Sequence, residues 1–165
     1  MNTPQTEQIV RPAPRMPERL IARPGFLLVR LGFAMKARSM EAFEQEGLSP
    51  YHYSVLELLA EKSRETQAEI ADALRLDRSQ LVGLLDGLEE DGLIERHRDP
   101  NDRRRHFVSL TPDGKRAVHK LRALVSRLED EFMAPLDAGE REALRRLLLR
   151  VACHHDTRFP PPEPS

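Results

Sequence analysis

Residues 66–110 read TQAEIADALRLDRSQLVGLLDGLEEDGLIERHRDPNDRRRHFVSL, and the spacing within this stretch decides the fold. Thr66 with Glu69 three residues later is a capping box, which opens a short helix. After a break at 75–77, Asp77 caps a second helix, which Gly92 ends. Apolar residues recur in that helix at i, i+3, i+4 and i+7, and this spacing predicts one buried stripe formed by Leu81, Leu84, Leu85 and Leu88.

A β-hairpin is predicted directly after this helix. Residues 93–98 and 106–110 are short, partly alternating segments, and the polar residues 99–105 join them in a loop long enough to project. Between positions 96 and 105 stand five arginines against two aspartates, a local net charge of +3 in a chain whose formal net charge is −1. Two helices, a tight turn and a basic hairpin predict a winged helix-turn-helix, whose second helix enters the major groove of DNA.

The remaining helices extend this lobe into a mainly α fold with a small β-hairpin wing. Residues 26–43 are apolar on most sides, which favours burial against a partner subunit. Thr111-Pro112 opens a later helix whose apolar residues repeat every three and four positions, like a coiled-coil seam, and Asp137 with Glu140 opens the last one. We expect flexible proline-rich tails at 1–23 and 154–165, a DNA-binding lobe at 48–111, and dimerisation helices at 24–47 and 112–153 of a domain spanning 24–153.

Composition narrows the class of protein further. The chain has 165 residues, with 26 Lys+Arg against 27 Asp+Glu, and its single cysteine excludes an internal disulfide framework. It has no apolar run long enough for a membrane span and no signal-like N-terminus, so we expect a cytoplasmic protein without a membrane partner. The residues form no nucleophile–base set, phosphate loop or catalytic carboxylate pair, so an enzyme is not expected, nor is a cofactor.

Three segments carry a resemblance to a known family. The stretch 67–93, the wing sequence Asp-Pro-Asn-Asp-Arg-Arg-Arg at 99–105 and Leu-Thr-Pro-Asp-Gly at 110–114 resemble the multiple-antibiotic-resistance regulator (MarR) family over roughly 26–151. The resemblance implies a homodimer that binds a pseudo-palindromic double-stranded DNA operator, and transcriptional repression relieved by a small phenolic, aromatic or anionic ligand. It also implies that Asp102 braces Arg104, which enters the minor groove.

The predicted site residues fall into three sets. The DNA-binding set is Thr66, Gln67, Arg78, Ser79, Gln80, Val82, Gly83, Asp102, Arg103, Arg104 and Arg105. The dimer-interface set is Phe26, Val29, Phe33, Val118, Leu121, Val125, Leu128, Phe132, Leu144, Leu148 and Val151. For the seam from Val118 to Phe132, core packing within the chain itself is the alternative. The ligand-pocket set is Arg30, Tyr51, His52, Tyr53 and His119, for which an aromatic edge packed on the first helix is the alternative.

Two other functions stay open at this point. Gly83 and Gly87 stand where family members often carry polar or basic residues, which is compatible with a winged-helix module that binds protein instead of DNA. Cys153, His154 and His155 are metal-ligand and redox residue types, so a metal- or redox-responsive regulator is a further alternative. Adjacent residues rarely point at one ion, so a frayed helix end is the preferred interpretation and no metal site is predicted.

Overall fold

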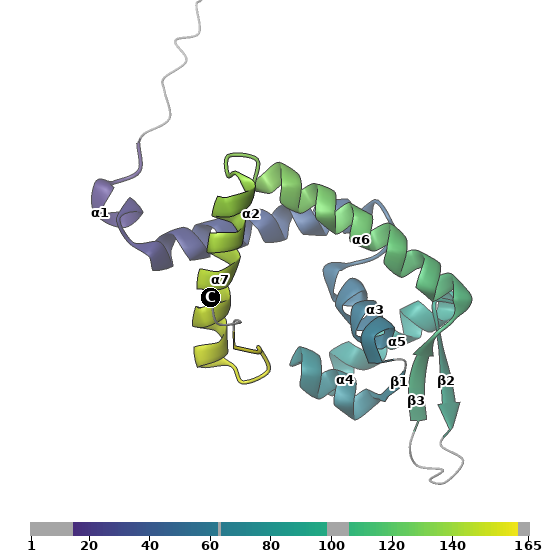
Figure 1. Ribbon diagram of the computed structural model, residues 1–165. Coiled ribbons are helices and arrows are strands. Elements are labelled where there is room, and N and C mark those ends of the chain that lie inside the picture. The colour runs from purple at the N-terminus through teal and green to yellow at the C-terminus, as the bar shows by residue number, and fades with distance from the viewer. Residues whose placement is uncertain (1–14, 63, 99–105, 162–165) are drawn as a thin grey trace, which may run out of the picture. The chain divides into compact units, whose positions relative to one another are not determined.

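The computed structural model describes residues 15–62, 64–98 and 106–161 (Figure 1). The elements follow the order α1 (Glu18–Ile21), α2 (Pro24–Glu44), α3 (Pro50–Lys62), β1 (Arg64–Thr66), α4 (Gln67–Leu74), α5 (Arg78–Glu90), β2 (Ile94–Arg98), β3 (His106–Leu110), α6 (Pro112–Phe132) and α7 (Ala138–His155). Among the described residues, no helix combines the length and the apolar composition that crossing a bilayer requires.

The chain divides into two compact units, which are residues 1–36 and residues 37–165. The first holds α1 and the first half of α2, so the expected tail at 1–23 contains one helical turn at 18–21. Pro17 stands at the N-cap of α1, where a missing N–H costs the helix nothing. The second unit contains α3 to α7 and the sheet.

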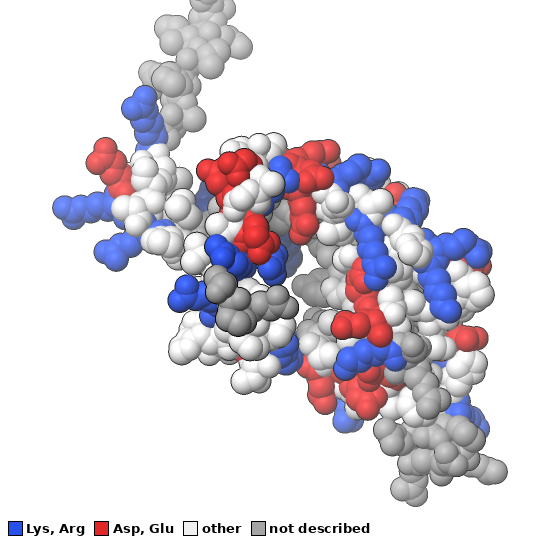
Figure 2. Space-filling model, viewed as in Figure 1, with Lys and Arg blue, Asp and Glu red and all other residues white. Residues whose placement is uncertain are grey.

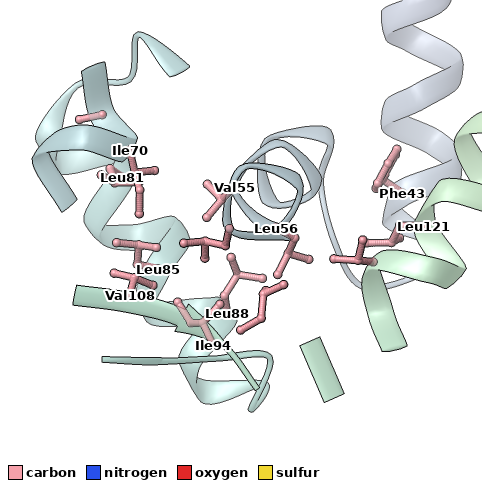
Figure 3. Packing of buried hydrophobic residues seen from close by; sticks show 14 residues of the cluster. Phe43, Val55, Leu56, Ile70, Leu81, Leu85, Leu88, Ile94, Val108 and Leu121 are labelled. Atoms are coloured by element: carbon pink, nitrogen blue, oxygen red, sulfur yellow. The ribbon is translucent and has the colours of Figure 1, made fainter. Parts of the chain in front are cut away.

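The core of the second unit lies where α3, α4 and α5 meet the sheet and α6. Leu81, Leu85 and Leu88 form the buried side of α5, as the spacing predicted, while Leu84 is half-buried. They pack in a cluster whose labelled members point toward one another in Figure 3. The side chains in that figure are those of Phe43, Val55, Leu56, Leu59, Ile70, Ala71, Leu81, Leu85, Leu88, Ile94, Val108, Leu110, Val118 and Leu121.

The sheet has three antiparallel strands in the order β1-β3-β2. The predicted hairpin is confirmed, with Ile94 opposite Leu110 and Arg98 opposite His106. The sequence-based prediction missed β1, which pairs Thr66 with Phe107. Three residues are too few to show alternation, and their partners lie far along the chain. Strand β2 is therefore an edge strand, held by β3 alone within the sheet.

A close contact joins the hairpin to α6. The Thr111 hydroxyl donates to the Gly92 carbonyl at 2.7 Å and accepts from the Gly114 N–H at 3.0 Å, so it caps α6 and binds the preceding turn at once. A Cβ added to Gly114 would lie 1.9 Å from the Leu93 carbonyl oxygen. Only glycine permits this approach, which gives the Leu-Thr-x-x-Gly motif a structural cause.

Helix α6 belongs to the core of its own chain over its first half. Val118 and Leu121 are 2% and 1% exposed in the single chain. Their predicted place in the dimer interface is therefore wrong, because their own lobe already covers them. The seam leaves the core further along, where Val125 and Leu128 are half-buried and Phe132 lies under the Arg38 guanidinium, 5.3 Å from the ring centre.

The segment after α7 is ordered against α4. Arg158 donates to the carbonyl oxygens of Ala73 at 2.8 Å and Asp72 at 3.3 Å, at the C-terminal end of α4. Asp156 accepts from the Arg158 Nε at 2.9 Å and lies 3.7 Å from Arg75. The expectation of a flexible tail from 154 is thus wrong for residues 154–158: α7 continues to His155, and charge-assisted hydrogen bonds fix Arg158.

Candidate DNA-binding surface

Helix α5 presents a polar N-terminal half to solvent. Arg78, Ser79 and Gln80 are all exposed in its first turn, and Val82 and Gly83 continue the same exposed side. The opposite side is fixed in the core by Leu81 and Leu85, so the orientation of the exposed side chains is set by packing. The acidic residues of α5 lie in its second half, away from this surface.

Asp77 organises the beginning of the helix. Its Oδ1 accepts from the Gln80 N–H at 2.8 Å and from the Ser79 hydroxyl at 2.6 Å. These hydrogen bonds, that of Ser79 first, lower the pKa of Asp77. Since the Ser79 hydroxyl proton is directed at Asp77, the oxygen of Ser79 is left to accept a hydrogen bond from a base or a water.

Thr66 and Gln67 stand at the start of α4. The Thr66 hydroxyl donates to the Glu69 carboxylate at 2.7 Å and accepts from the Glu69 N–H at 3.3 Å, which confirms the capping box. Thr66 is only 8% exposed. The Thr66 hydroxyl is used within the cap and Gln67 is half-buried beside it, and the contact of these two residues with DNA stays a prediction.

The two glycines of α5 leave space on its surface. A Cβ on Gly83 would meet nothing within 4 Å, and one on Gly87 would come no closer than 3.9 Å to His52. Neither glycine is required by the packing of the lobe. Gly83 leaves a bare backbone on the exposed side of α5, whereas Gly87 faces His52 of α3.

The wing is described only up to its strands. Asp102, Arg103, Arg104 and Arg105 lie outside the described residues. On β2, Arg98 is exposed, and His97 lies 3.1 Å from the Glu95 carboxylate. Arg96 turns toward α5, where its Nη2 donates to the Asp86 Oδ1 at 2.5 Å. Of the five arginines counted in the wing, Arg96 is therefore engaged within the lobe.

The residues of the predicted ligand pocket lie in different places. Arg30 belongs to the first compact unit, and Tyr51 is exposed on α3. His52 accepts from the Ser49 N–H at 3.0 Å, which caps α3. Tyr53 packs against Phe43 with ring centres 5.6 Å apart. Of the set, only His119 is among the residues that line the cavity described next.

A cavity of about 500 Å³ lies between α3, β3 and the first half of α6. Its apolar wall includes Leu59 and Val118, and its polar side chains are those of Ser109, Lys115, His119 and Arg122. Arg122 forms a bidentate salt bridge with Glu57, in which both N–O distances are 2.8 Å. The hydrogen bonds from Arg122 lower the pKa of Glu57. Lys and Arg side chains follow α6 on the face shown in Figure 2.

Apolar side chains remain exposed on α2 and α7. In the single chain Phe33 is 68% exposed, and α7, all of which is described, has no buried residue. Val29, Leu147 and Val151 are also exposed by more than half. Exposed apolar side chains on each of these helices favour an interaction with another molecule. The predicted interface residues on α2 and α7 are available for one.

The end of α7 carries the cysteine and two histidines. The Cys153 Sγ donates to the Arg150 carbonyl at 3.3 Å, and the His154 and His155 rings meet edge to face at 5.0 Å. Within the part of the chain that the structure describes, no three metal-ligating side chains come together.

Comparisons with known proteins agree on one family. A family model described as "MarR family" matches residues 48–106, the stretch from the loop before α3 to the start of β3. The transcriptional regulatory protein for the hcr operon of Thauera aromatica is 35% identical over 135 residues, covering 77% of this chain and 81% of the relative.

Two solved structures illustrate what similar proteins bind. CouR from Rhodococcus jostii RHA1, bound to p-coumaroyl-CoA, is 33% identical with a TM-score of 0.69, over 82% of this chain and 96% of CouR. A mutant of MarR from Escherichia coli, complexed with operator DNA, is 27% identical with a TM-score of 0.67, over 77% of this chain and 91% of that protein.

Proposed function

Because this chain belongs to the MarR family of transcriptional regulators, we propose that it is a homodimeric repressor which a small anionic ligand releases from its operator. It is a DNA-binding transcriptional regulator. The observation that carries the proposal is the exposed N-terminal half of α5, where Arg78, Ser79 and Gln80 stand on a rigid lobe beside the hairpin. The proposed binding to operator DNA supports a location in the cytoplasm.

Each of these three side chains suits a part of an operator. An arginine binds guanine O6 and N7 or a phosphate, a glutamine binds adenine, and Val82 beside them fits a thymine methyl. The MarR–operator complex supports this use of the lobe. The wing residues Asp102 and Arg104 add minor-groove contact, as the family resemblance implies.

Two lobes are needed to read a two-fold operator. The exposed apolar residues of α2 and α7 support a homodimer, since a stable interface of this kind buries on the order of 2,000 Å². The dimer must then hold its two α5 helices about 34–36 Å apart, or a multiple of one turn, to meet successive major grooves.

The basic cavity is the proposed effector site. Lys115 and His119 can bind an anion, and the apolar wall favours an aromatic body, whereas Arg122 is already paired with Glu57. The CouR complex supports an aromatic acyl ligand in a related protein. Such a ligand weakens DNA binding only through its preference for the dimer geometry that does not fit the operator, and operator DNA must weaken the ligand by the same factor.

Footprinting on the promoter beside the chain's own gene tests DNA reading. We expect protection of a pseudo-palindrome by the wild type, and loss of that protection in Arg78→Ala and Gln80→Ala. Arg127→Ala, which removes an exposed arginine from α6, is the matched control. A protein-binding module would protect no site.

Calorimetry with salicylate and p-coumaroyl-CoA, with and without operator, tests regulation. We expect Lys115→Gln to weaken a ligand that uses the cavity, and operator to weaken it too. Equal ligand affinity in the two titrations would show that the site is not coupled to DNA.

A further inference from the structure

One arginine of the hairpin, Arg96, contacts two acidic residues of α5. Arg96, on edge strand β2, donates from Nη2 to the Asp86 Oδ1 at 2.5 Å, and its Nε lies 3.5 Å from the Glu89 Oε2. Asp86 and Glu89 stand three residues apart and so share one side of α5. We refer to these three residues as the Arg96 clamp.

The Arg96 clamp differs from an ordinary surface ion pair. The Arg96 side chain is only 20% exposed, although its partners are 59% and 44% exposed. Its Nε is closed off from solvent and forms no hydrogen bond of its own, so the nearby Glu89 carboxylate supplies the local compensation for the charge. Removing an acid would leave a largely buried cation short of a partner, which makes the arrangement sensitive to either carboxylate.

The position of the clamp links the two parts of the lobe that face DNA. Helix α5 carries Arg78 and Gln80 at one end, and Arg96 binds it near the other. Because the sheet order is β1-β3-β2, β2 has no strand on its outer side. The backbone hydrogen bond from Leu93 to Leu88 and the buried side chain of Ile94 join the start of β2 to α5. The Arg96 clamp adds a polar contact further along the strand, where it can restrain the angle between the hairpin and α5.

The clamp also accounts for acids on a helix that enters DNA. Asp86 and Glu89 lie in the second half of α5, away from Arg78 and Gln80, and their contacts with Arg96 give them a role within the lobe. Building on the proposed function, we propose that Arg96 is a positioning residue that sets the wing against α5, so that both reach one operator, without itself contacting DNA.

Substitution of the acidic residues distinguishes a positioning role from simple charge repulsion. If the clamp positions the wing, removing its acid weakens operator binding, whereas if the acid only repels DNA, removing it tightens operator binding. Asp86→Asn removes the main partner of Arg96. Glu90→Gln removes an equal charge one turn along, where no bond to the clamp is described, and is the matched control. Affinities for the footprinted operator and for an unrelated duplex are measured by fluorescence anisotropy at several salt concentrations.

We expect Asp86→Asn to weaken operator binding about five- to tenfold, with binding to the unrelated duplex unchanged or tighter. Glu90→Gln should leave both affinities unchanged or tighter. If Asp86→Asn tightened operator binding as much as Glu90→Gln does, the clamp would have no positioning role and the proposal would be overturned.

Two further variants complete the test. Arg96→Gln should weaken operator binding with an unchanged salt slope, whereas a slope smaller by about one would show a direct phosphate contact and overturn the proposal. The exchanged pair Asp86→Arg with Arg96→Asp should recover part of the lost affinity. Urea unfolding confirms that each variant is folded. Failure of the proposed function would look different, since the wild type itself would then select no operator.

Discussion

At the scale of single residues, Gly114 and Gly83 predict opposite responses to the same change. Gly114→Ala places a Cβ against the Leu93 carbonyl and should lower the free energy of unfolding by about 2–4 kcal/mol. Gly83→Ala, which has open space in an exposed helix, should raise it by about 0.5–1 kcal/mol. Urea unfolding measures both. Equal effects would contradict the close contact at Gly114.

His52 makes the stability of the lobe depend on pH. Burial lowers its pKa from 6.5, and attraction to Asp91 opposes this only in part. A lower pKa in the folded state means that the unfolded chain binds the proton more tightly, so the contribution of His52 is present above about pH 6.5 and is lost as the pH falls below that value. A protonated ring also cannot accept the Ser49 N–H.

The His52→Asn variant isolates this contribution. Its side-chain oxygen can accept the Ser49 N–H at any pH, and the chain's other histidines are unchanged. We expect the wild type to lose more stability than the variant between pH 7.5 and pH 5.5 in urea unfolding. Parallel losses would assign the dependence to other groups.

At the scale of elements, Arg158 stabilises the end of α4. A helix C-terminus carries unpaired carbonyls and a partial negative charge, and the Arg158 guanidinium meets both. Arg158→Ala should therefore accelerate amide hydrogen exchange at residues 72–77 and leave α5 and the hairpin unchanged. Arg127→Ala serves as the control. Unchanged exchange at 72–77 would mean that the contact does not stabilise the turn.

Elements differed in how far the sequence could predict them. The caps at Thr66, Asp77 and Asp137 were predictable because each is completed within three residues. The contact of Arg158 with α4 was not, because a single arginine in a proline-rich segment carries no sign of a partner more than eighty positions earlier. Arg96 was counted with the basic wing for the same reason: net charge does not show which cations are paired.

At the scale of the whole molecule, we expect Phe33→Glu to dissociate the dimer. The ring is 68% exposed in the single chain, so a partner subunit is what would cover it, and a buried unpaired charge there is costly. Sedimentation at micromolar concentration should show monomer for Phe33→Glu and dimer for Glu61→Gln, an exposed change on α3. A dimeric Phe33→Glu would place the interface elsewhere.

The interface and the effector site show where prediction from sequence ends. Heptad spacing marks an apolar stripe but does not say whether the chain's own core or a second chain covers it. Val118 and Leu121 are covered by the chain's own core, whereas the apolar side chains of Leu147 and Val151 on α7 are exposed in the single chain. The cavity could not be predicted, because Ser109, Lys115 and Arg122 meet Leu59 only after β3 and α6 have packed on α3.

The close contact between the hairpin and α6 at Gly114, which we call the joint, affects how such a regulator can change over evolutionary time. Gly92, Thr111 and Gly114 connect the hairpin to α6, while the side chains of α5 that we propose to read DNA point away from the core. Selection can therefore act on the two sets separately, and the exposed side of α5 can drift to a new operator without disturbing the joint. A paralogue that had lost DNA binding altogether would still keep the motif at residues 110–114. The motif therefore indicates common descent, but it does not indicate which genes a protein regulates.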